Sequence, residues 1–488
     1  MTESTSSFKI IGRKEEQQIL EELYQRNVPN LVAVYGRRRV GKTYLVASVF
    51  GSRIPFRHTG IQPIDNCKKA YKSETKRQLE AFFISLQSYG WEETNLPKNW
   101  LEAFAMLERL LEKKKAERKS VLFFDEIQWM DTSHSDFISA FGYFYNQWAS
   151  VHNVLVVICG SSTSWIQNKL INSHGGLYDR VTREIALKPF TLKECEEYVS
   201  QFGIEMSRYT LSCCYMTFGG IPFYWNYLTK NKSLVQNIDM LFFQQNGPLR
   251  SEFSRLFRSL FDHSDSVESI IRALFCKSRG LTRSEISAQT GIKKNGDLTS
   301  MLNSLIAGDF IVKYVSFGQN KKEPLYKLTD PFCLFYLNFV DKESSFGEGT
   351  WLKISDSPKV RTWQGLAFEN VCFHHIPQIK DALGIRNLET SQSLWSKKGN
   401  DEDPGTQIDL ILYRKDMICN MCEIKFLEDE FTVDKDYHLI LTRRKNLLKE
   451  VLPKRFSVQN VLISSYGLKK NSYQNDFAYV LTLDDLFR

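Results

Sequence analysis

Residues 31–43, LVAVYGRRRVGKT, decide the fold class of the first part of this chain. A short apolar run leads into six residues from Gly36 to Gly41, and Lys42 and Thr43 follow, which is the G-x-x-x-x-G-K-T phosphate-loop pattern. The pattern predicts a buried strand, a loop and a helix in that order. Glycines at both ends let successive backbone N–H groups turn toward a polyphosphate, and the helix adds its positive end.

The residue types of the loop also indicate which ligand it binds. Lys42 can reach the β- and γ-phosphates of a nucleoside triphosphate, and the Thr43 hydroxyl can bind Mg²⁺, so we expect ATP and Mg²⁺ as cofactors. The residues expected at the nucleotide are Gly36, Arg37, Arg38, Arg39, Val40, Gly41, Lys42, Thr43 and Tyr44. Upstream, residues 10–12 either lie against the adenine or belong to the cap of an amphipathic helix.

A second apolar run, SVLFFD at residues 120–125, ends in two acids, Asp125 and Glu126. An acid at the carboxyl end of a parallel strand can bind the Mg²⁺ that Thr43 holds, and the next acid can orient and deprotonate a water. We assign Asp125 to the metal and Glu126 to the water. The alternative is a strand that ends in solvated acids.

A third apolar run, residues 153–159, leads into Gly160, Ser161, Ser162 and Thr163. Ser161 or Ser162 at the strand tip can hydrogen-bond the γ-phosphate or the water, and an equally good reading is a helix N-cap by Ser162 or Thr163. Farther on, Arg180, and with less support Arg183, is a candidate arginine finger for the nucleotide of a neighbouring subunit. A surface ion pair is the alternative.

Five motifs, in this order, resemble the archaeal-type ATPases, a branch of the AAA+/STAND P-loop superfamily. They are GRRRVGKT, FFDEIQW, CGSS, LYDRVTREIALKPF and GGIPFYW. The resemblance covers residues 8–227 and implies an αβα ATPase core with a small helical lid. It also implies that Gly220 and Pro222 face the nucleotide, whereas the residues alone indicate a helix end and a sharp turn.

The middle of the chain predicts three short helices and a hairpin. The helices are expected at 267–275, 282–290 with Thr282 as cap, and 297–305; strands are expected at 311–314 and 325–328. This order is that of a winged helix, which the resembled ATPases typically carry here. Five residues, Lys293, Lys294, Asn295, Thr299 and Asn303, would face a DNA groove, and Lys321 and Lys322 would contact phosphate. Alternatively, the module links domains or binds protein.

Three separated pieces near the C-terminus suggest a second site for phosphate chemistry. A helix at about 362–375 carries Glu369, the strand QIDLIL carries Asp409, and the strand MCEIKF carries Glu423 and Lys425. Strand alternation places Glu423 and Lys425 on one face, and a hairpin would bring Asp409 beside them. Two such acids can bind Mg²⁺ or Mn²⁺, and the lysine can position a water for attack on a phosphodiester.

These pieces resemble the PD-(D/E)XK nuclease fold over roughly residues 360–470. The resemblance implies Glu369, Asp409 and Glu423 as metal ligands, with Asp409, Glu423 and Lys425 as the cutting centre. Ile408 stands where the family often has Pro. The alternative is a strand pair with exposed charges. The basic run Arg443, Arg444 and Lys445 either tracks a DNA backbone or is a solvated helix face.

The length of 488 residues exceeds what one core usually holds, so we expect several domains. A net charge of +8 is compatible with a polyanion partner. Ten scattered cysteines and a polar N-terminus favour the cytoplasm, and Cys419 and Cys422 are expected to be packing residues. No apolar run reaches the ~18 residues of a membrane span.

We therefore expect a multidomain α/β protein that binds ATP and DNA and is compatible with a homo-oligomer. The expected parts are a P-loop ATPase core at 1–187, a helical lid at 188–255, a winged helix at 256–340, a linker at 341–358 and a restriction-endonuclease-like domain at 359–488. In the leading interpretation, ATP controls engagement or metal-dependent cleavage of DNA. In the competing one, the protein is an ATP-dependent switch or scaffold whose C-terminal domain binds nucleic acid or protein without cutting.

Overall fold

The computed structural model describes residues 10–63, 71–114, 118–172, 176–261, 263–315, 317, 323–343, 346–397 and 405–488. Its contacts divide the chain into two compact units, Met1–Lys188 and Pro189–Arg488. The first unit ends one residue beyond the expected end of the ATPase core. None of the described helices is long and apolar enough to cross a membrane.

The first unit is built on a five-stranded sheet in which every neighbouring pair of strands is parallel. The strand order is β2 (Phe56–Thr59), β3 (Ser120–Asp125), β4 (Val154–Gly160), β1 (Asn30–Tyr35) and β5 (Arg183–Ala186). Every residue of β1 and β4 is buried, as expected for strands covered on both faces. The three strands that the apolar runs predict are confirmed to within one residue at either end.

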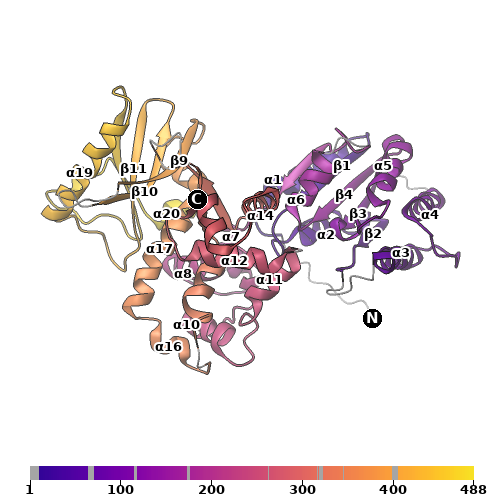
Figure 1. Cartoon of the computed structure of the whole chain (residues 1–488), viewed down its shortest axis with the longest axis horizontal. Helices are drawn as coiled ribbons and strands as arrows, with labels where there is room; N and C mark the ends of the chain where they lie inside the picture. The colour runs from indigo at the N-terminus through magenta and orange to yellow at the C-terminus, as the bar shows by residue number, and fades with distance from the viewer. Residues whose placement is uncertain are drawn as a thin grey trace. The chain divides into compact units, whose positions relative to one another are not determined.

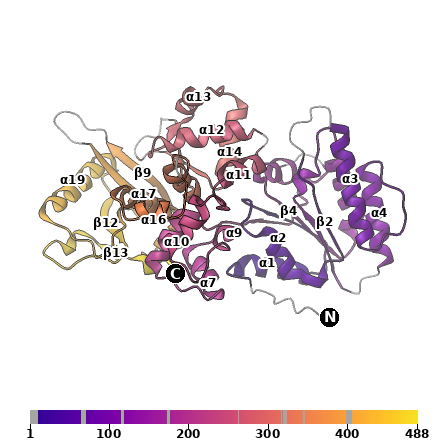
Figure 2. The same cartoon turned by 90° about the horizontal axis from the view of Figure 1, so that it is seen from below.

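Helices cover both faces of this sheet, and Figure 2 shows α1 (Lys14–Gln25) and α2 (Lys42–Phe50) on one side, with α3 (Tyr71–Ser88) and α4 (Trp100–Lys113) on the other. Together with α5 (Phe137–Gln147), the second group closes an aromatic core against alternate strand residues. Rings such as Phe82, Trp100 and Phe104 lie with their centroids 5.5–5.9 Å apart. This packing fixes the carboxyl ends of the strands, where the first candidate site lies.

The second unit begins with short helices and the elements expected of a winged helix. The helices are α7 (Leu192–Gln201), α8 (Arg208–Phe218), α9 (Pro222–Trp225), α10 (Leu234–Ile238), α11 (Glu252–Leu260), α12 (Ser264–Phe275), α13 (Arg283–Thr290) and α14 (Gly296–Ala307). An antiparallel sheet follows in the order β6 (Leu281–Thr282), β8 (Leu325–Leu328), β7 (Ile311–Tyr314). Thr282 caps α13 through a capping box with Glu285, as the sequence indicates. We call residues 264–328 the winged-helix segment.

Part of the segment expected as a linker, residues 341–358, is packed. Before it lies α15 (Pro331–Phe335), and within it α16 (Thr350–Ile354) carries the buried Trp351. The Trp351 ring stacks on Phe243 at 5.6 Å, and its backbone N–H donates to Asp239 Oδ1 at 2.7 Å. The polar composition of the segment does not predict that Trp351 is packed in this way.

The C-terminal part of the second unit is a mixed sheet, drawn with α19 (Lys435–Val451) in Figure 1. Its order is β13 (Tyr479–Leu481), β12 (Ser457–Ser464), β11 (Ile418–Lys425), β10 (Thr406–Arg414) and β9 (Thr390–Lys397). Strands β9, β10 and β11 pair antiparallel, whereas β11, β12 and β13 pair parallel. Apolar residues of α19 pack on the sheet, and α17 (Pro358–His374) contacts β10 and β11.

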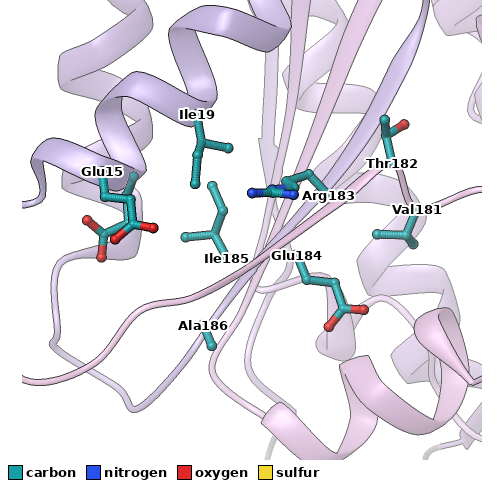
Figure 3. Close-up of a pocket in the computed structure, with 9 residues that line it drawn as sticks. Glu15, Ile19, Val181, Thr182, Arg183, Glu184, Ile185 and Ala186 are labelled. Atoms are coloured by element: carbon teal, nitrogen blue, oxygen red, sulfur yellow. The ribbon is translucent and has the colours of Figure 1, made fainter. Parts of the chain in front are cut away.

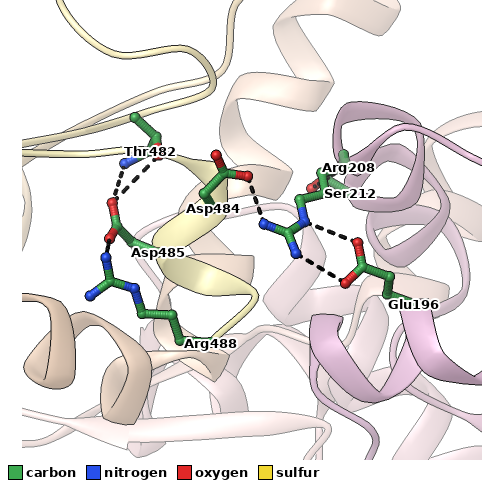
Figure 4. A network of polar contacts seen from close by, with 7 residues as sticks. All are labelled: Glu196, Arg208, Ser212, Thr482, Asp484, Asp485 and Arg488. Atoms are coloured by element: carbon green, nitrogen blue, oxygen red, sulfur yellow. Dashed lines mark hydrogen bonds and ion pairs between the residues drawn. The ribbon is translucent and has the colours of Figure 1, made fainter.

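Polar contacts tie the C-terminal elements to the first helices of the same unit. Figure 4 shows Arg208 of α8 between Glu196 of α7 and Asp484 of α20 (Leu483–Leu486), with N–O distances of 2.9 and 2.7 Å. The Tyr209 ring stacks on Phe426 at 4.6 Å. The expected helical lid and the C-terminal sheet are therefore parts of one compact unit, although they are far apart in sequence.

Candidate functional site

The phosphate loop joins β1 to α2, as its pattern predicts. Gly36 and Gly41 have φ values of 147° and 96°, and Arg39, at 72°, shares the left-handed region that side chains rarely adopt. A Cβ on Gly36 would lie 2.3 Å from the carbonyl oxygen of Leu187, so no side chain fits there. The Leu187 N–H donates to Tyr35 O at 2.7 Å, which fixes this approach between the end of β1 and the chain after β5.

Lys42 is buried and lies at the first position of α2. Its ammonium donates to the backbone carbonyls of Gly36 at 2.9 Å and Arg37 at 3.0 Å. Burial lowers the pKa of Lys42, and the nearby charges of Glu126 and Asp125 oppose that shift. The loop thus holds a buried cation at its centre by its own backbone.

The other residues expected at the nucleotide differ in how deeply their side chains are buried. The side chains of Arg37 and Val40 are buried, those of Arg38 and Arg39 are half-buried, and the Tyr44 side chain is 47% exposed. Because the side chains of Arg37 and Val40 are buried, a phosphate contact at these two positions would have to come from their backbone N–H groups.

Thr43 and Asp125 meet, as the metal assignment requires. The Thr43 hydroxyl donates to Asp125 Oδ2 at 2.8 Å. Burial raises the pKa of Asp125, and the Thr43 hydrogen bond opposes the shift. A hydroxyl beside a carboxylate is the oxygen donor set that Mg²⁺ takes in phosphate-loop proteins, so these two residues fit the cation.

Glu126 is held by Gln128 and Ser161, which follow strands β3 and β4 respectively. Its φ of 47° is left-handed, and its Oε2 accepts from Ser161 Oγ at 2.8 Å, from the Ser161 N–H at 3.3 Å and from Gln128 Nε2 at 2.6 Å. The structure therefore brings together the expected water-orienting acid and the expected sensor. Ser162, by contrast, makes no side-chain cap to the following helix α6 (Thr163–Ile166).

Sequence reasoning missed two side chains of this site. Gln128 stands two residues after Glu126 in FFDEIQW, and its amide bridges Glu126 and Ser161 Oγ at 3.1 Å. Arg57 on β2 lies 3.5 Å from Asp125 Oδ2. The parallel pairing of β2 with β3 places it there. Gln128 could have been found from the motif, whereas no local pattern points to Arg57.

Arg180 and Arg183 have exposed side chains. Arg183 lines a cavity of about 500 Å³ between α1 and β5, with Glu15, Glu16 and Ile19 on the helix side (Figure 3). No phosphate-loop residue lines that cavity. An arginine finger at Arg180 stays a prediction, since it needs a second chain.

Gly220 and Pro222 belong to the second unit, where their local roles are clear. A Cβ on Gly220 would lie 2.0 Å from Phe190 O, and the Phe190 N–H donates to Gly220 O at 2.6 Å. Pro222 begins α9. This close approach explains the second glycine by packing, and the expected nucleotide contact of both residues stays a prediction.

The C-terminal acids lie where the hairpin prediction puts them. Strands β10 and β11 pair antiparallel with Leu410 opposite Cys422, and Asp409 Oδ2 accepts from the Ile424 N–H at 3.2 Å. Glu423 is 3% exposed and accepts from Lys425 Nζ at 2.7 Å. Asp409, Glu423 and Lys425 are thus brought together at one end of the hairpin.

Helix α19 closes the site with two more side chains. Arg444 Nη1 donates to Glu423 Oε2 at 2.5 Å, and the Tyr437 hydroxyl also donates to Glu423. Arg444 is part of the basic run 443–445, and its guanidinium binds an acid of the C-terminal site. Tyr437 was not anticipated, because its place depends on the packing of α19 on the sheet.

Burial and mutual repulsion perturb the acids strongly. Burial, followed by the charge of Glu423, raises the pKa of Asp409 to about 6. Burial, followed by the charge of Asp409, raises the pKa of Glu369 to about 7. Burial also raises the pKa of Glu423, but Lys425 and Arg444 outweigh it, and the net pKa of Glu423 is lowered. Asp409, Glu369 and Glu423 therefore differ in their affinity for a proton.

A divalent cation was expected on these acids. Asp409 and Glu423 supply carboxylate oxygens, the donor type that Mg²⁺ and Mn²⁺ prefer, and in this respect they fit. In the part of the chain that the structure describes, no three His, Cys, Asp or Glu side chains gather closely enough to hold a metal ion. Glu369 lies 4.0 Å from Lys327 Nζ. Cys419 and Cys422 are buried and unbridged, in keeping with packing residues.

Some of the residues expected to face DNA in the winged-helix segment instead contact neighbouring residues of the same segment. Lys294 Nζ lies 2.7 Å from Glu323 Oε1, Asn295 caps α14, and Thr299 Oγ1 donates to Asn295 O at 3.3 Å. Lys293 and Asn303 are exposed. Lys321 and Lys322 lie outside the described residues.

Comparison with known proteins identifies the first part of the chain. Residues 10–228 match the family model described as "ATPase domain predominantly from Archaea". A protein of Methanocaldococcus jannaschii described as uncharacterized is 24% identical over 408 residues, which are 80% of this chain and 83% of that protein. An uncharacterized ATP-binding protein of the same organism is 53% identical over 36 residues, 7% of this chain and 61% of that protein.

Solved structures give more distant similarities. A Walker-type ATPase of Pyrococcus abyssi matches at 21% identity and a TM-score of 0.46, covering 67% of this chain and 96% of its own. The ORC2 protein of Aeropyrum pernix matches at 11% identity and 0.40, covering 66% and 91%. The RuvB Holliday junction branch migration motor of Thermotoga maritima matches at 13% and 0.35, covering 64% and 92%. On the family match and the phosphate-loop geometry, residues 10–228 are an ATPase domain of the kind found predominantly in Archaea.

Proposed function

We propose that ATP binding and hydrolysis at the phosphate loop control DNA binding and metal-dependent DNA cleavage at the C-terminal acid site. The observation that carries the cleavage half is the meeting of Asp409, Glu423 and Lys425 at one end of the β10–β11 hairpin. Two acids with a lysine at this spacing are suited to attack on a phosphodiester.

At the phosphate loop, each side chain has a separate task. The loop N–H groups and Lys42 would hold the phosphates, and Thr43 and Asp125 would hold Mg²⁺, which when bound neutralises charge on the phosphates. Glu126 would orient the attacking water. Because Ser161 and Gln128 hold the Glu126 carboxylate, these two residues control where that base points.

At the C-terminal site, Asp409 and Glu423 would hold a divalent cation, which when bound supplies Lewis-acid stabilisation of charge on the phosphodiester. Lys425, hydrogen-bonded to Glu423, would position the water. DNA binding would draw on basic side chains, with Lys293 on the winged-helix segment and Arg443 and Lys445 of α19 as candidates. In an oligomer, Arg180 would act on the nucleotide of a neighbouring subunit.

A specific observation favours a second candidate function. Two acids of the C-terminal site already lie near cations, since Glu423 contacts Lys425 and Arg444, and Glu369 lies near Lys327. A site that is neutralised by its own side chains has less need of a metal ion. Such a site would suit an ATP-dependent switch or scaffold whose C-terminal domain binds nucleic acid or protein without cutting.

The test is cleavage of single-stranded, linear and supercoiled DNA with Mg²⁺ or Mn²⁺, in the presence and absence of ATP. The variants are Lys42→Ala and Lys425→Ala, with Lys415→Ala as the matched control, because Lys415 lies at the tip of the same hairpin and pairs with Glu389. We expect cleavage to be lost in Lys425→Ala, altered in Lys42→Ala and retained in Lys415→Ala.

Intact substrates under all conditions, together with ATP hydrolysis, would reject the nuclease and favour the switch. Light scattering with and without ATP then examines assembly directly. An ATP-dependent change of mass supports the switch, whereas the same mass in both states counts against it.

A further inference from the structure

A lysine of the winged-helix segment reaches the C-terminal acid site. Lys327 lies on β8 and is 7% exposed, which is rare for a lysine. Its Nζ lies 4.0 Å from Glu369 Oε2 and 5.2 Å from the centroid of the Phe373 ring. Both neighbours are on α17, so a strand of one module contacts the acid-bearing helix of the next.

The pKa of Lys327 depends on two carboxylates of the C-terminal acid site. Burial lowers the pKa of Lys327, while Glu369 and Asp409 raise it, in that order. Of these two carboxylates, Glu369 on α17 is the one that Lys327 contacts, across the boundary between β8 and α17. A buried ammonium is costly unless a carboxylate compensates it, so Glu369 accounts for how Lys327 can be inside the protein.

The pair also borders open space. Lys327 and Glu369 line a cavity of about 470 Å³, whose other walls include Leu274, Trp363 and Leu366. An ion that enters this cavity meets the ammonium and the carboxylate together. Lys327 and a divalent cation in this cavity would therefore compete for the charge of the Glu369 carboxylate.

We propose that Lys327 is a positioning residue of the C-terminal site that holds Glu369 and competes with a divalent cation, so that the winged-helix segment sets the metal affinity. This inference rests on the metal site of the proposed function. Its physical basis is Coulombic: removing the positive charge that lies 4.0 Å from Glu369 strengthens the attraction of that carboxylate for a second cation.

The experiment measures Mn²⁺ bound to the full chain by the paramagnetic resonance signal of free Mn²⁺. Lys327→Met removes the charge, Lys327→Arg keeps it, and Asp409→Asn reports binding elsewhere on the chain. Lys359→Met is the matched control, because Lys359 lines the same cavity but donates to the Asn338 carbonyl and lies over the Phe339 ring.

We expect Lys327→Met to bind Mn²⁺ about tenfold more tightly than the wild type. Lys327→Arg and Lys359→Met should stay within about twofold of the wild type. Equal or weaker Mn²⁺ binding in Lys327→Met overturns the inference and leaves the proposed metal site standing. If no variant binds more Mn²⁺ than Asp409→Asn, both the inference and the metal site are rejected.

A second measurement keeps the inference testable if Lys327→Met folds poorly. Glu369→Gln leaves a buried ammonium without its carboxylate, so its urea midpoint should fall below that of the wild type. Adding Lys327→Met to Glu369→Gln should then raise the midpoint. A double variant that is less stable than Glu369→Gln would show that the two side chains are not paired.

Discussion

The phosphate loop and the C-terminal acid site hold their buried charges by different means. At the loop, the ammonium of Lys42 is held by the backbone carbonyls of Gly36 and Arg37, which lie within six residues of it. At the C-terminal site, the carboxylate of Glu423 is held by Lys425, Tyr437 and Arg444, and the last two come from α19. Backbone carbonyls that are close in sequence thus stabilise the buried charge of the phosphate loop. Side chains from β11 and α19 stabilise the buried charge of the C-terminal acid site.

This difference has consequences for mutation. A backbone carbonyl cannot be removed by substitution, so the loop depends on its glycines and on Lys42 itself. Side-chain cations can be removed one at a time, and each removal leaves buried negative charge behind. We therefore expect substitutions at the loop to affect chemistry more than stability, and substitutions around Glu423 to affect both.

The largest expected effect is on hydrolysis. Lys42→Ala should lower the rate of ATP hydrolysis by roughly 10³-fold, because the cation that contacts the β- and γ-phosphates is lost. Phosphate release measures the rate, and the urea midpoint should change little. A large loss of stability in Lys42→Ala would break the contrast between the two sites.

The next effect is on the stability of the second unit. Arg444→Met should lower the free energy of unfolding by about 3 kcal/mol, because Glu423 keeps its buried charge and loses a cation. Urea unfolding followed by circular dichroism measures the change, with Lys449→Met, at an exposed lysine of the same helix, as a control. Similar midpoints in the two variants would mean that Lys425 alone neutralises Glu423.

Acid should weaken the second unit through His375. This imidazole is buried, accepts from the Leu192 N–H at 2.9 Å through Nε2 and contacts Val371 O at 2.8 Å through Nδ1. Burial lowers its pKa to about 4, against about 6.5 in the unfolded chain. The unfolded state therefore binds more protons between these values, so stability is full above pH 6.5 and is lost as the pH falls toward 4.

Between pH 7 and pH 5 this loss should be about 2 kcal/mol. Urea unfolding at the two pH values measures it, and His375→Gln should reduce the difference, since glutamine can make both hydrogen bonds without titrating. The exposed His263→Gln serves as the control. An unchanged pH dependence in His375→Gln would assign the effect to other groups.

Substitution of Arg57, the cation beside the phosphate-loop site, should have the least effect. Arg57 lies 3.5 Å from Asp125 with a side chain that is 37% exposed, so Arg57→Met should change the free energy of unfolding by about 0.5 kcal/mol or less. The same urea assay applies. A loss as large as that in Arg444→Met would show that the loop site, too, depends on a side-chain cation for its stability.

Much of the fold could be predicted from the sequence where the signal is local. The strand Ser120–Asp125 and the hairpin strands Ile311–Tyr314 and Leu325–Leu328 have the predicted bounds, because apolar runs and turn residues lie within a few positions. The packed Trp351 was not predicted, since its partners Asp239 and Phe243 lie more than 100 residues earlier. Polar composition alone cannot report such a contact.

Local sequence patterns alone specify the phosphate loop with Lys42 and Thr43, the acids Asp125 and Glu126, and the alternation that puts Glu423 and Lys425 on one face. In each case the chemistry and the geometry are encoded in a few consecutive residues. The three-dimensional fold was needed to show that Ser161 and Gln128 hold Glu126, that Arg444 holds Glu423 and that Lys327 lies near Glu369. Those pairings, apart from Gln128 with Glu126, join residues that are distant in the chain, and they follow from strand order and helix packing, which no local pattern specifies.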